Sequence, residues 1–257
     1  IAIAAGVEVM TRTPMGASVV KGEMGWPFPP SMQERYADTG LPPQGIGAEM
    51  IADEYGLSRT DLDAWGATSQ ERALRATEEG RFENEIVPVP VVIDGTEELF
   101  SRDEGIRPGT TVESLGNLKP AFKEDGKITA GNSSQICDGA AAVLIMSEEK
   151  AKELGLTPRA RLHSFAVAGT DPVTMLKGPI PATAKILERS GLSIDDIDLF
   201  EVNEAFASVP LAWAKEYGNG EPDKLLARTN VNGGAIALGH PLGCSGAKLM
   251  ATLLCEL

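Results

Sequence analysis

The sequence of 257 residues predicts an α/β fold. Its apolar side chains are mostly Ala, Val, Ile and Leu, aromatic residues make up only 5% of the chain, and there are 28 glycines. This mix suits an α/β enzyme with tight turns better than a β-sandwich. In addition, strand and helix patterns alternate in the second half, while the first half contains a long irregular insertion.

The first half is expected to place two helices within this insertion. Residues 47–55 and 62–79 have helical patterns, and Ser58 followed by Asp61 gives a capping signal before the second helix. That helix is expected to be exposed and amphipathic and to end at Gly80. The extended segments expected here are a buried central strand at 1–5, an edge strand or extended loop at 86–93, and a short strand at 127–130.

The second half is expected to alternate between strands and helices. The expected elements are a small-residue helix or strand in 131–147, a short helix at 150–155, a long strand at 159–169, a helix at 181–190, a strand and then a helix in 194–206, a strand and turn at 229–237, and a helix from 242 onward. The character of the chain changes near 150–158, so we predict an N-terminal unit, 1–149, and a C-terminal unit, 150–257. The first would include a loop subdomain at about 12–128.

Both ends of the chain interrupt a pattern. Residue 1 is Ile in a strand pattern, and the last residues, LMATLLCEL, have no helix stop signal. We therefore expect the chain to be incomplete at both ends, and a boundary without biological meaning is the simplest cause.

Charge and cysteine content exclude several classes of protein. The net charge of −14 argues against a general nucleic-acid binder, although one local basic patch could still bind a phosphorylated ligand. Cys137, Cys244 and Cys255 are widely spaced and show neither a disulfide framework nor zinc spacing, so we expect no metal site and a cytoplasmic location. No apolar run approaches ~20 residues, so no association with a membrane is expected.

The segment NVNGGAIALGHPLGCSGAK, residues 230–248, is the most informative part of the sequence. Its glycines allow backbone and ligand to approach closely, and Pro241 fixes the turn after His240. This pattern favours a catalytic His240 over a structural one. The other histidine, His163, lies in a strand pattern and is expected to be packed.

Two further motifs are candidates for a site. In EVNEAFAS, residues 201–208, Asn203 is expected at a strand end, where its amide could hold a water or a carbonyl oxygen or could simply cap a helix. In TAGNSSQICDGAAAVLIMS, residues 129–147, small side chains either admit a narrow ligand or allow close packing.

Together and in this order, GNSS with DGAAA, VNEAFA and NVNGGAIALGHPLG resemble the thiolase family, the acetyl-CoA acyltransferases (EC 2.3.1). AGVEVMTR, GRFENEIVPV, LKPAF and GPIPAT extend the likeness along essentially the whole chain. The resemblance implies a layered αβαβα core with an inserted loop subdomain. It also implies a homodimer or homotetramer in fatty acid and lipid metabolism. Such an enzyme cleaves 3-ketoacyl-CoA to acyl-CoA and acetyl-CoA, or runs the reverse Claisen condensation, with coenzyme A and acyl-CoA as substrates and no permanently bound cofactor.

The resemblance assigns roles to residues that match the family's motifs. His240 would activate the nucleophilic cysteine and help form an oxyanion hole, in which Asn203 would position a water. The matches to ligand contacts are Arg107 and Ser114 at the CoA adenine nucleotide, Phe122, Ala130 and Ser134 along the pantetheine arm, and Met175 and Phe206 in the acyl pocket.

Two departures from the family pattern stand out. The nucleophilic and acid/base cysteines of the family lie outside this sequence, and neither Cys137, Cys244 nor Cys255 matches them. We therefore expect the chain as written to be catalytically incompetent. Pro43 and Gln44 stand where short-chain biosynthetic members have a His-Met pair, which favours a 3-ketoacyl-CoA thiolase for longer or bulkier acyl chains.

Three alternatives are weaker. A non-catalytic acyl-CoA-binding thiolase-like subunit would have no need of the intact GHP and NEAF motifs. Ketoacyl-carrier-protein synthases have different histidine motifs, and lipid-transfer-type thiolases usually alter NEAF.

Overall fold

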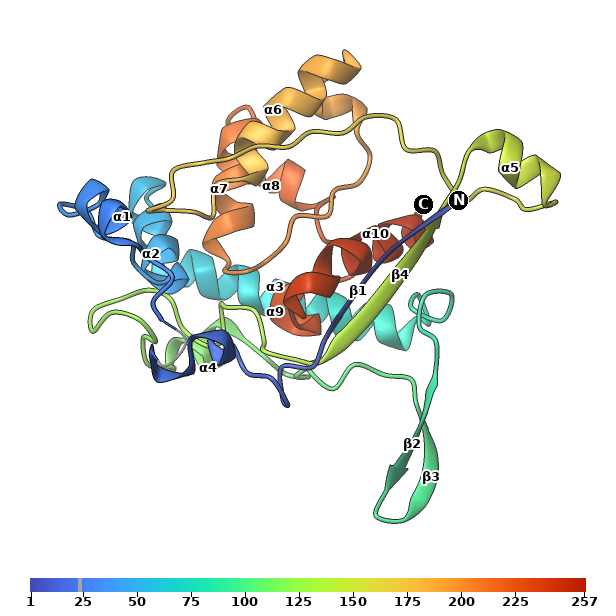
Figure 1. The fold of residues 1–257 in the computed structure, drawn as a ribbon, viewed down its shortest axis with the longest axis horizontal. Coiled ribbons are helices and arrows are strands. Elements are labelled where there is room, and N and C mark those ends of the chain that lie inside the picture. Colours follow the sequence, from blue (N-terminus) through green and yellow to red (C-terminus); the bar gives the residue numbers. More distant parts are fainter. Residues whose placement is uncertain (23–24) are drawn as a thin grey trace.

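The computed structural model describes residues 1–22 and 25–257, and it confirms the predicted α/β class. Helices surround the main hydrophobic core (Figure 1), which is formed mainly by α2 (Gln44–Glu54), α3 (Arg59–Glu78), α7 (Ser208–Tyr217) and the segments between them. Trp213 of α7 is only 1% exposed at the centre of this cluster.

Helix α3 begins as the sequence predicts. The Ser58 hydroxyl accepts from the Asp61 N–H at 3.1 Å, and the Asp61 carboxylate accepts from the Ser58 N–H at 2.8 Å, which is the predicted capping box. The expectation of an exposed amphipathic helix holds for one face only, because the opposite face of α3 is buried. The buried face includes the polar side chains of Asp63, Ser69 and Gln70, which form hydrogen bonds with other parts of the chain.

Strand β1 (Ala2–Glu8) pairs with β4 (Gly139–Ile145) in an antiparallel ladder that runs from Ala2 opposite Ile145 to Glu8 opposite Gly139. Helix α10 (Ser245–Glu256) packs against this pair. The prediction that residues 1–5 are a strand is confirmed, but the prediction that they are buried is wrong. Ile3 is 70% exposed because, among the described residues, the sheet has only two strands and α10 packs against one side of it.

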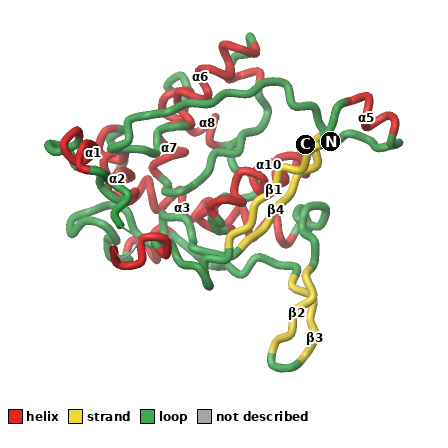
Figure 2. Tube along the Cα trace, in the orientation of Figure 1, coloured by secondary structure: helices red, strands yellow, loops and turns green. Residues whose placement is uncertain are grey.

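Strands β2 (Val89–Ile93) and β3 (Thr96–Phe100) form a hairpin that projects from the body (Figure 2). Asp94 and Gly95 both have positive φ, 50° and 82°, as a two-residue hairpin turn with this twist requires. The extended segment predicted at 86–93 is thus confirmed as a strand, and its partner was not predicted.

Other strand predictions are wrong. Residues 127–130 and 159–169 form no strand. Segments 194–206 and 229–237 form only isolated bridges among the described residues, a parallel one between Phe200 and Thr229 and an antiparallel one between Phe206 and Ser133. In 159–169, side chains of α6 (Pro179–Ser190) bind backbone carbonyls in place of a neighbouring strand: Lys185 Nζ lies 3.0 Å from the Val167 oxygen. His163 in this segment is exposed, so the expectation that it is packed is also wrong.

The remaining helices are short. They are η1 (Ala17–Gly22), α1 (Pro30–Arg35), α4 (Val112–Gly116), α5 (Glu148–Glu153), η2 (Ile194–Asp196), α8 (Pro222–Leu226), α9 (Ala235–Leu238) and η3 (Leu242–Cys244). The helices predicted at 150–155 and 181–190 correspond to α5 and α6, and α10 continues the helix predicted from residue 242. Over the part of the chain that is described, no helix has both the length and the apolar character needed to span a membrane.

Candidate active site

His240 directly follows α9 and its closing residue Gly239. The His240 N–H donates to the Gln135 carbonyl at 3.0 Å, and the ring Nδ1 lies 2.5 Å from the Ser245 hydroxyl. The Ser245 hydroxyl also lies 3.1 Å from the Pro241 carbonyl, and when it donates to that carbonyl it accepts from the ring, an arrangement that places the ring hydrogen on Nδ1. In this tautomer Nε2 carries the lone pair that can take up a proton.

Asn203 faces this lone pair. Its Nδ2 lies 3.4 Å from His240 Nε2, so the structure brings together two residues that are 37 positions apart in the chain. Helix α7 begins at Ser208 with Ala207 at its N-cap position, so Asn203 is not the helix cap that the sequence left open. Burial lowers the pKa of His240, and Lys248 adds to this effect, which keeps the ring neutral at pH 7.

The segment with Ala130 and Ser134 runs beside the NEAF motif. The Ser134 N–H donates to the Ala205 carbonyl at 3.0 Å, and Ser133 forms an antiparallel bridge with Phe206. Ala130 is exposed at the start of this segment. The small residues of 129–147 thus pack closely against the NEAF motif at Ser133 and Ser134 and are exposed beside it at Ala130.

Phe122, Phe206 and Met175 lie around the start of α2. The Phe122 and Phe206 rings meet edge to face with centroids 5.8 Å apart. A Cβ at Gly45 would fall within 2.3 Å of the Phe122 ring, so this position of α2 requires glycine. Met175 has a positive φ of 45°, and the neighbouring Thr174 carbonyl lies against Gly47 of α2.

Arg107 and Ser114 lie on the surface. The Arg107 side chain is exposed, while its backbone N–H donates to the Gln70 side chain at 2.8 Å. The Ser114 hydroxyl donates to the Thr111 carbonyl at 2.8 Å and accepts from the Thr111 N–H at 3.0 Å, which closes a capping box on α4. The structure thus gives Ser114 a local structural role that the sequence did not predict.

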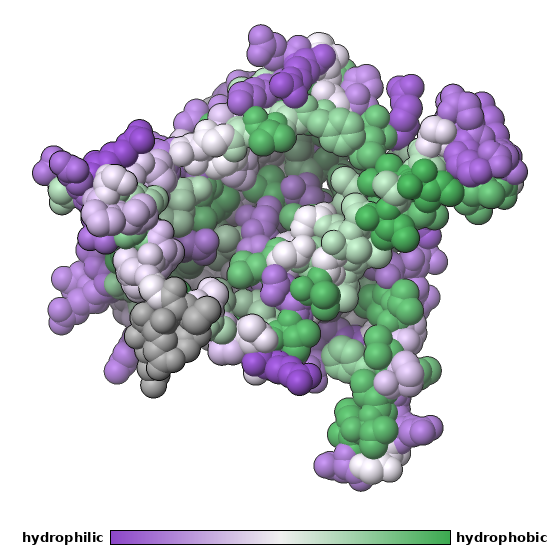
Figure 3. All heavy atoms as spheres, in the orientation of Figure 1, coloured by the Kyte–Doolittle hydropathy of each residue, from purple (hydrophilic) through white to green (hydrophobic). Residues whose placement is uncertain are grey.

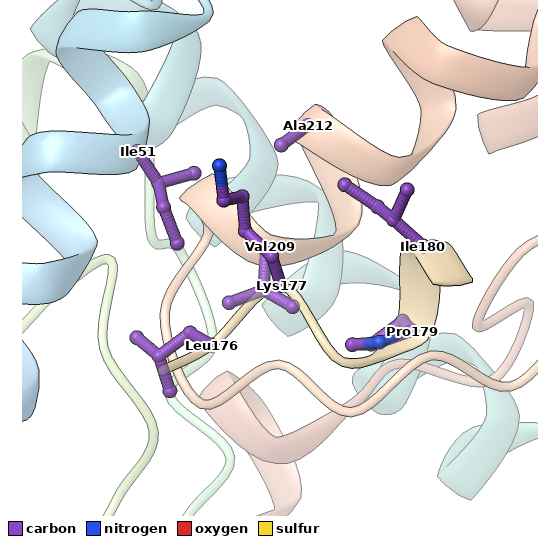
Figure 4. Close-up of a pocket in the computed structure, with 7 residues that line it drawn as sticks. All are labelled: Ile51, Leu176, Lys177, Pro179, Ile180, Val209 and Ala212. Atoms are coloured by element: carbon purple, nitrogen blue, oxygen red, sulfur yellow. The ribbon is translucent and has the colours of Figure 1, made fainter. Parts of the chain in front are cut away.

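Two hollows lie near α6. The one in Figure 4 is lined by apolar residues, among them Ile51, Ile180 and Val209, and by Lys177, and none of its lining residues is a predicted site residue. The second, with a volume of about 270 Å³, is bordered by Asn203 and Glu201. Burial raises the pKa of Glu201 to about 8, and the Glu204 carboxylate adds to that rise.

Three residues that hold these loops were not predicted from the sequence. The Gln135 carbonyl and the Ser245 hydroxyl fix His240 as described above, and Glu204, directly after Asn203, is completely buried. Its position next to Asn203 in NEAF was the one signal that could have drawn attention to it.

Comparisons with known proteins agree with the motifs. The family models described as the thiolase N-terminal domain and the thiolase C-terminal domain match residues 1–149 and 156–257. A 3-ketoacyl-CoA thiolase of Photobacterium profundum is 51% identical over 98% of this chain and 63% of its own length. An acetyl-CoA acetyltransferase of Pseudomonas aeruginosa is 52% identical over 83% of this chain and 53% of its own length.

Solved structures show the same relationship. The human mitochondrial 3-ketoacyl-CoA thiolase has a TM-score of 0.83 at 37% identity, with 99% of this chain and 65% of that chain covered. The Bacillus anthracis acetyl-CoA acetyltransferase has a TM-score of 0.82 at 39% identity, with the same two coverages. The chain spans 53% to 65% of the length of these relatives.

Proposed function

The chain belongs to the thiolase family, and we propose that it functions as an acyltransferase. The proposed reaction cleaves 3-ketoacyl-CoA with CoA to give acyl-CoA and acetyl-CoA, or runs in reverse as a Claisen condensation. The observation that supports this most directly is the pairing of a neutral His240 with the Asn203 amide at 3.4 Å. A non-catalytic acyl-CoA-binding subunit has no use for a base and a hydrogen-bond donor in this arrangement.

His240 Nε2 is the base in this proposal. It takes the proton of a cysteine thiol, because a free thiol is only slightly ionised at neutral pH and the thiolate is the nucleophile. The thiolate then attacks the 3-keto carbonyl carbon of the ketoacyl chain. As the bond to the acetyl unit breaks, the acetyl-CoA enolate oxygen gains negative charge, and hydrogen bonds from the protonated His240 ring and from a water on Asn203 stabilise it. The enolate carbon takes a proton from the second cysteine of the family and leaves as acetyl-CoA. That second thiolate takes the proton of the incoming CoA thiol, whose sulfur attacks the acyl-cysteine and releases acyl-CoA, and the freed nucleophilic thiolate recovers its proton from His240.

Cys137 and Cys244 are poor candidates for the cysteines of this reaction. Burial raises the pKa of both thiols, which disfavours the thiolate. Cys244 is also only 1% exposed. The side chain of Cys255, which is on α10, lies 2.9 Å from a guanidinium nitrogen of Arg159. We propose that none of the three is the nucleophile.

The acyl and CoA sites follow from the residues around α2. We propose that Met175 and Phe206 shape the acyl pocket, that Phe122, Ala130 and Ser134 contact the pantetheine arm, and that Arg107 and Ser114 contact the adenine nucleotide. Pro43 and Gln44 stand at the start of α2, next to Gly45 and the Phe122 ring. A change there would reshape the pocket, which supports longer or bulkier acyl chains than acetoacetyl-CoA.

The remaining proposals concern assembly and location. Apolar residues on β1, β4 and the hairpin, including Ile3, Leu144 and Leu99, are exposed, and apolar surface gathers there (Figure 3), which supports a homodimer or homotetramer. Free cysteines support a reducing cytoplasm. Fatty acid metabolism follows from the proposed substrate.

The test is thiolysis by the purified protein at its full natural length, with 3-ketoacyl-CoA substrates of increasing chain length and CoA. We expect release of acetyl-CoA, with higher kcat/KM for long or bulky chains than for acetoacetyl-CoA. Binding of CoA without turnover of any substrate would favour the non-catalytic subunit. A preference for acetoacetyl-CoA would overturn the proposed chain-length selectivity alone.

A further inference from the structure

The Glu204 carboxylate is the centre of a buried hydrogen-bond network. It is 0% exposed and accepts four hydrogen bonds. Oε1 accepts from Trp65 Nε1 at 3.0 Å and from Asn230 Nδ2 at 2.9 Å. Oε2 accepts from Ser69 Oγ at 2.7 Å and from the Ile236 N–H at 3.1 Å. The partners come from two parts of the chain, α3 and the segment 230–236.

Each of these partners can only donate to the carboxylate. An indole N–H, an amide NH₂ and a backbone N–H have no accepting atom. The Ser69 hydroxyl accepts from the Gly234 N–H at 3.0 Å, so its hydrogen points to Glu204. Burial raises the pKa of Glu204, and the hydrogen bonds oppose that rise. A proton on either oxygen would face a donor, so the site is built for the charged form.

Arg72 places a positive charge beside this network. Its guanidinium lies over the Trp65 ring, 5.4 Å from the centroid, and donates to the Leu226 carbonyl at 3.1 Å. Burial lowers the pKa of Arg72, and the attraction of Glu204 opposes that fall. The buried carboxylate therefore has charge compensation without a direct ion pair among the described residues.

The network connects the two candidate catalytic residues. Asn203 directly precedes Glu204, and Gly234 and Ile236 form the first turn of α9, whose end leads to His240. A Cβ at Gly234 would lie 2.2 Å from the Glu204 carboxyl carbon, so the α9 backbone rests directly on this side chain. Both loops are tied to the same helix, α3, through Trp65 and Ser69.

We propose that Glu204 is a positioning residue that sets the distance between Asn203 and His240 by binding both of their loops to α3. A carboxylate suits this role because its two oxygens accept four donors at fixed angles. An error of about 1 Å in such a site can cost about 100-fold in rate. Loss of the Glu204 side chain should therefore slow the reaction even in molecules that remain folded.

The test is Glu204→Gln in the full chain, which keeps the shape but places an NH₂ group against two donors. Nitrogen-15 spectra of histidine side chains report the tautomer and pKa of His240, and the signal lost in His240→Gln assigns it. We expect the wild-type ring to be the Nδ1–H tautomer. In Glu204→Gln we expect a mixture of tautomers and a pKa closer to 6.5, the ordinary value. We also expect kcat to fall about 10- to 100-fold with KM changed less than twofold.

Glu49→Gln is the matched control. Glu49 is also buried, at 3% exposure, and accepts from the N–H groups of Lys127 and Ile128 at 2.8 to 2.9 Å. We expect this variant to lower the melting temperature comparably and to leave the His240 signals unchanged. If both variants lose stability and neither changes His240, Glu204 is structural only and the proposal is overturned.

Ser69→Ala keeps the test possible if Glu204→Gln does not fold. It removes one donor to Glu204 and the acceptor of the Gly234 N–H, and we expect a smaller shift of the His240 signals in the same direction. Unchanged signals in this variant would also overturn the proposal. The inference rests on the proposed function for its kinetic readout only. A protein without thiolysis would fail that function, while the spectra would still decide the role of Glu204.

Discussion

The loops that hold Asn203 and His240 are built differently from the segment that we propose binds the CoA nucleotide. We call residues 203–207 and 230–240 the anchored loops and residues 107–122 the exposed rim. Most residues of the anchored loops are buried, and both loops contain residues of the Glu204 network. In the exposed rim, Leu115 is the one buried residue. The difference indicates that the interior fixes the positions of the proposed reacting groups, whereas the proposed contacts to the nucleotide depend on solvent-exposed side chains. Substitutions in the anchored loops should therefore lower kcat, and substitutions in the rim should raise KM.

His240→Gln gives the largest expected effect. Gln keeps polarity but has no basic nitrogen, so we expect kcat to fall about 10³-fold or more while the melting temperature changes little, because the ring is only partly buried. His163→Gln is the matched control, since His163 is exposed and should change neither quantity. Equal losses in both variants would contradict a specific role for His240. Steady-state thiolysis and thermal unfolding measure the two effects.

Asn203→Ala comes next. Loss of one donor to a developing oxyanion costs about 10²- to 10³-fold in kcat, with little change in KM, because the interaction forms in the transition state. Asn117→Ala is the control, since that amide donates to the Glu113 carbonyl on α4 in the rim. The comparison between loops and rim fails if the Asn203 variant raises KM and leaves kcat unchanged.

The pH dependence of the reaction tests the same loops without a substitution. Burial disfavours the charged imidazolium of His240, so its folded pKa is below 6.5 and the ring stays a base at pH 6.5. We expect kcat/KM to fall as pH drops through this lowered pKa, about tenfold per pH unit. The unfolded chain takes up the proton at the ordinary pKa, so His240 also makes stability fall as pH falls below 6.5. An acid limb centred above pH 6.5 would rule out this environment.

The sequence predicts the fold best where the signals are local. The α3 capping box depends on Ser58 and Asp61 alone, and it forms as predicted. The predicted strand at 159–169 failed because its alternating pattern says only that the segment could pair, while pairing depends on a partner elsewhere in the chain. Helix α3 was expected to be exposed because its composition is polar. Nothing local shows that Ser69 binds Glu204, 135 positions away.

The candidate site, like the fold, could be predicted from the sequence only where the signals are local. Glycines around His240 mark a loop on which other groups pack closely, and the contact of Gly234 with Glu204 shows one such constraint. The motifs identify Asn203 and His240 as candidates, but their 3.4 Å separation requires the fold. Roles in the exposed rim came from the resemblance alone, because an exposed Arg or Ser leaves no packing signal in the sequence.

Arg107→Ala is the first test within the exposed rim. Its guanidinium is exposed, so an ion pair with a phosphate is worth up to about 1 kcal/mol, or about fivefold in affinity. We expect KM for CoA to rise about fivefold at low salt, kcat to stay constant, and the difference to shrink as salt is added. Arg161→Ala, another exposed arginine, should leave KM unchanged. A drop in kcat for the Arg107 variant would place this residue with the anchored loops instead.

Ser114→Ala is expected to have the smallest effect, and it separates two roles of one hydroxyl. In the structure this hydroxyl closes the capping box of α4, and its loss should lower the free energy of unfolding by about 0.5 kcal/mol. Because the hydrogen already points to the Thr111 carbonyl, the hydroxyl can offer CoA only an acceptor lone pair, which suits an adenine amino group and not a phosphate. We therefore expect KM for CoA to change less than twofold. Thr111→Ala removes the other half of the same cap without touching the Ser114 hydroxyl's lone pair, so a rise in KM in the Ser114 variant alone would show that this hydroxyl binds the nucleotide.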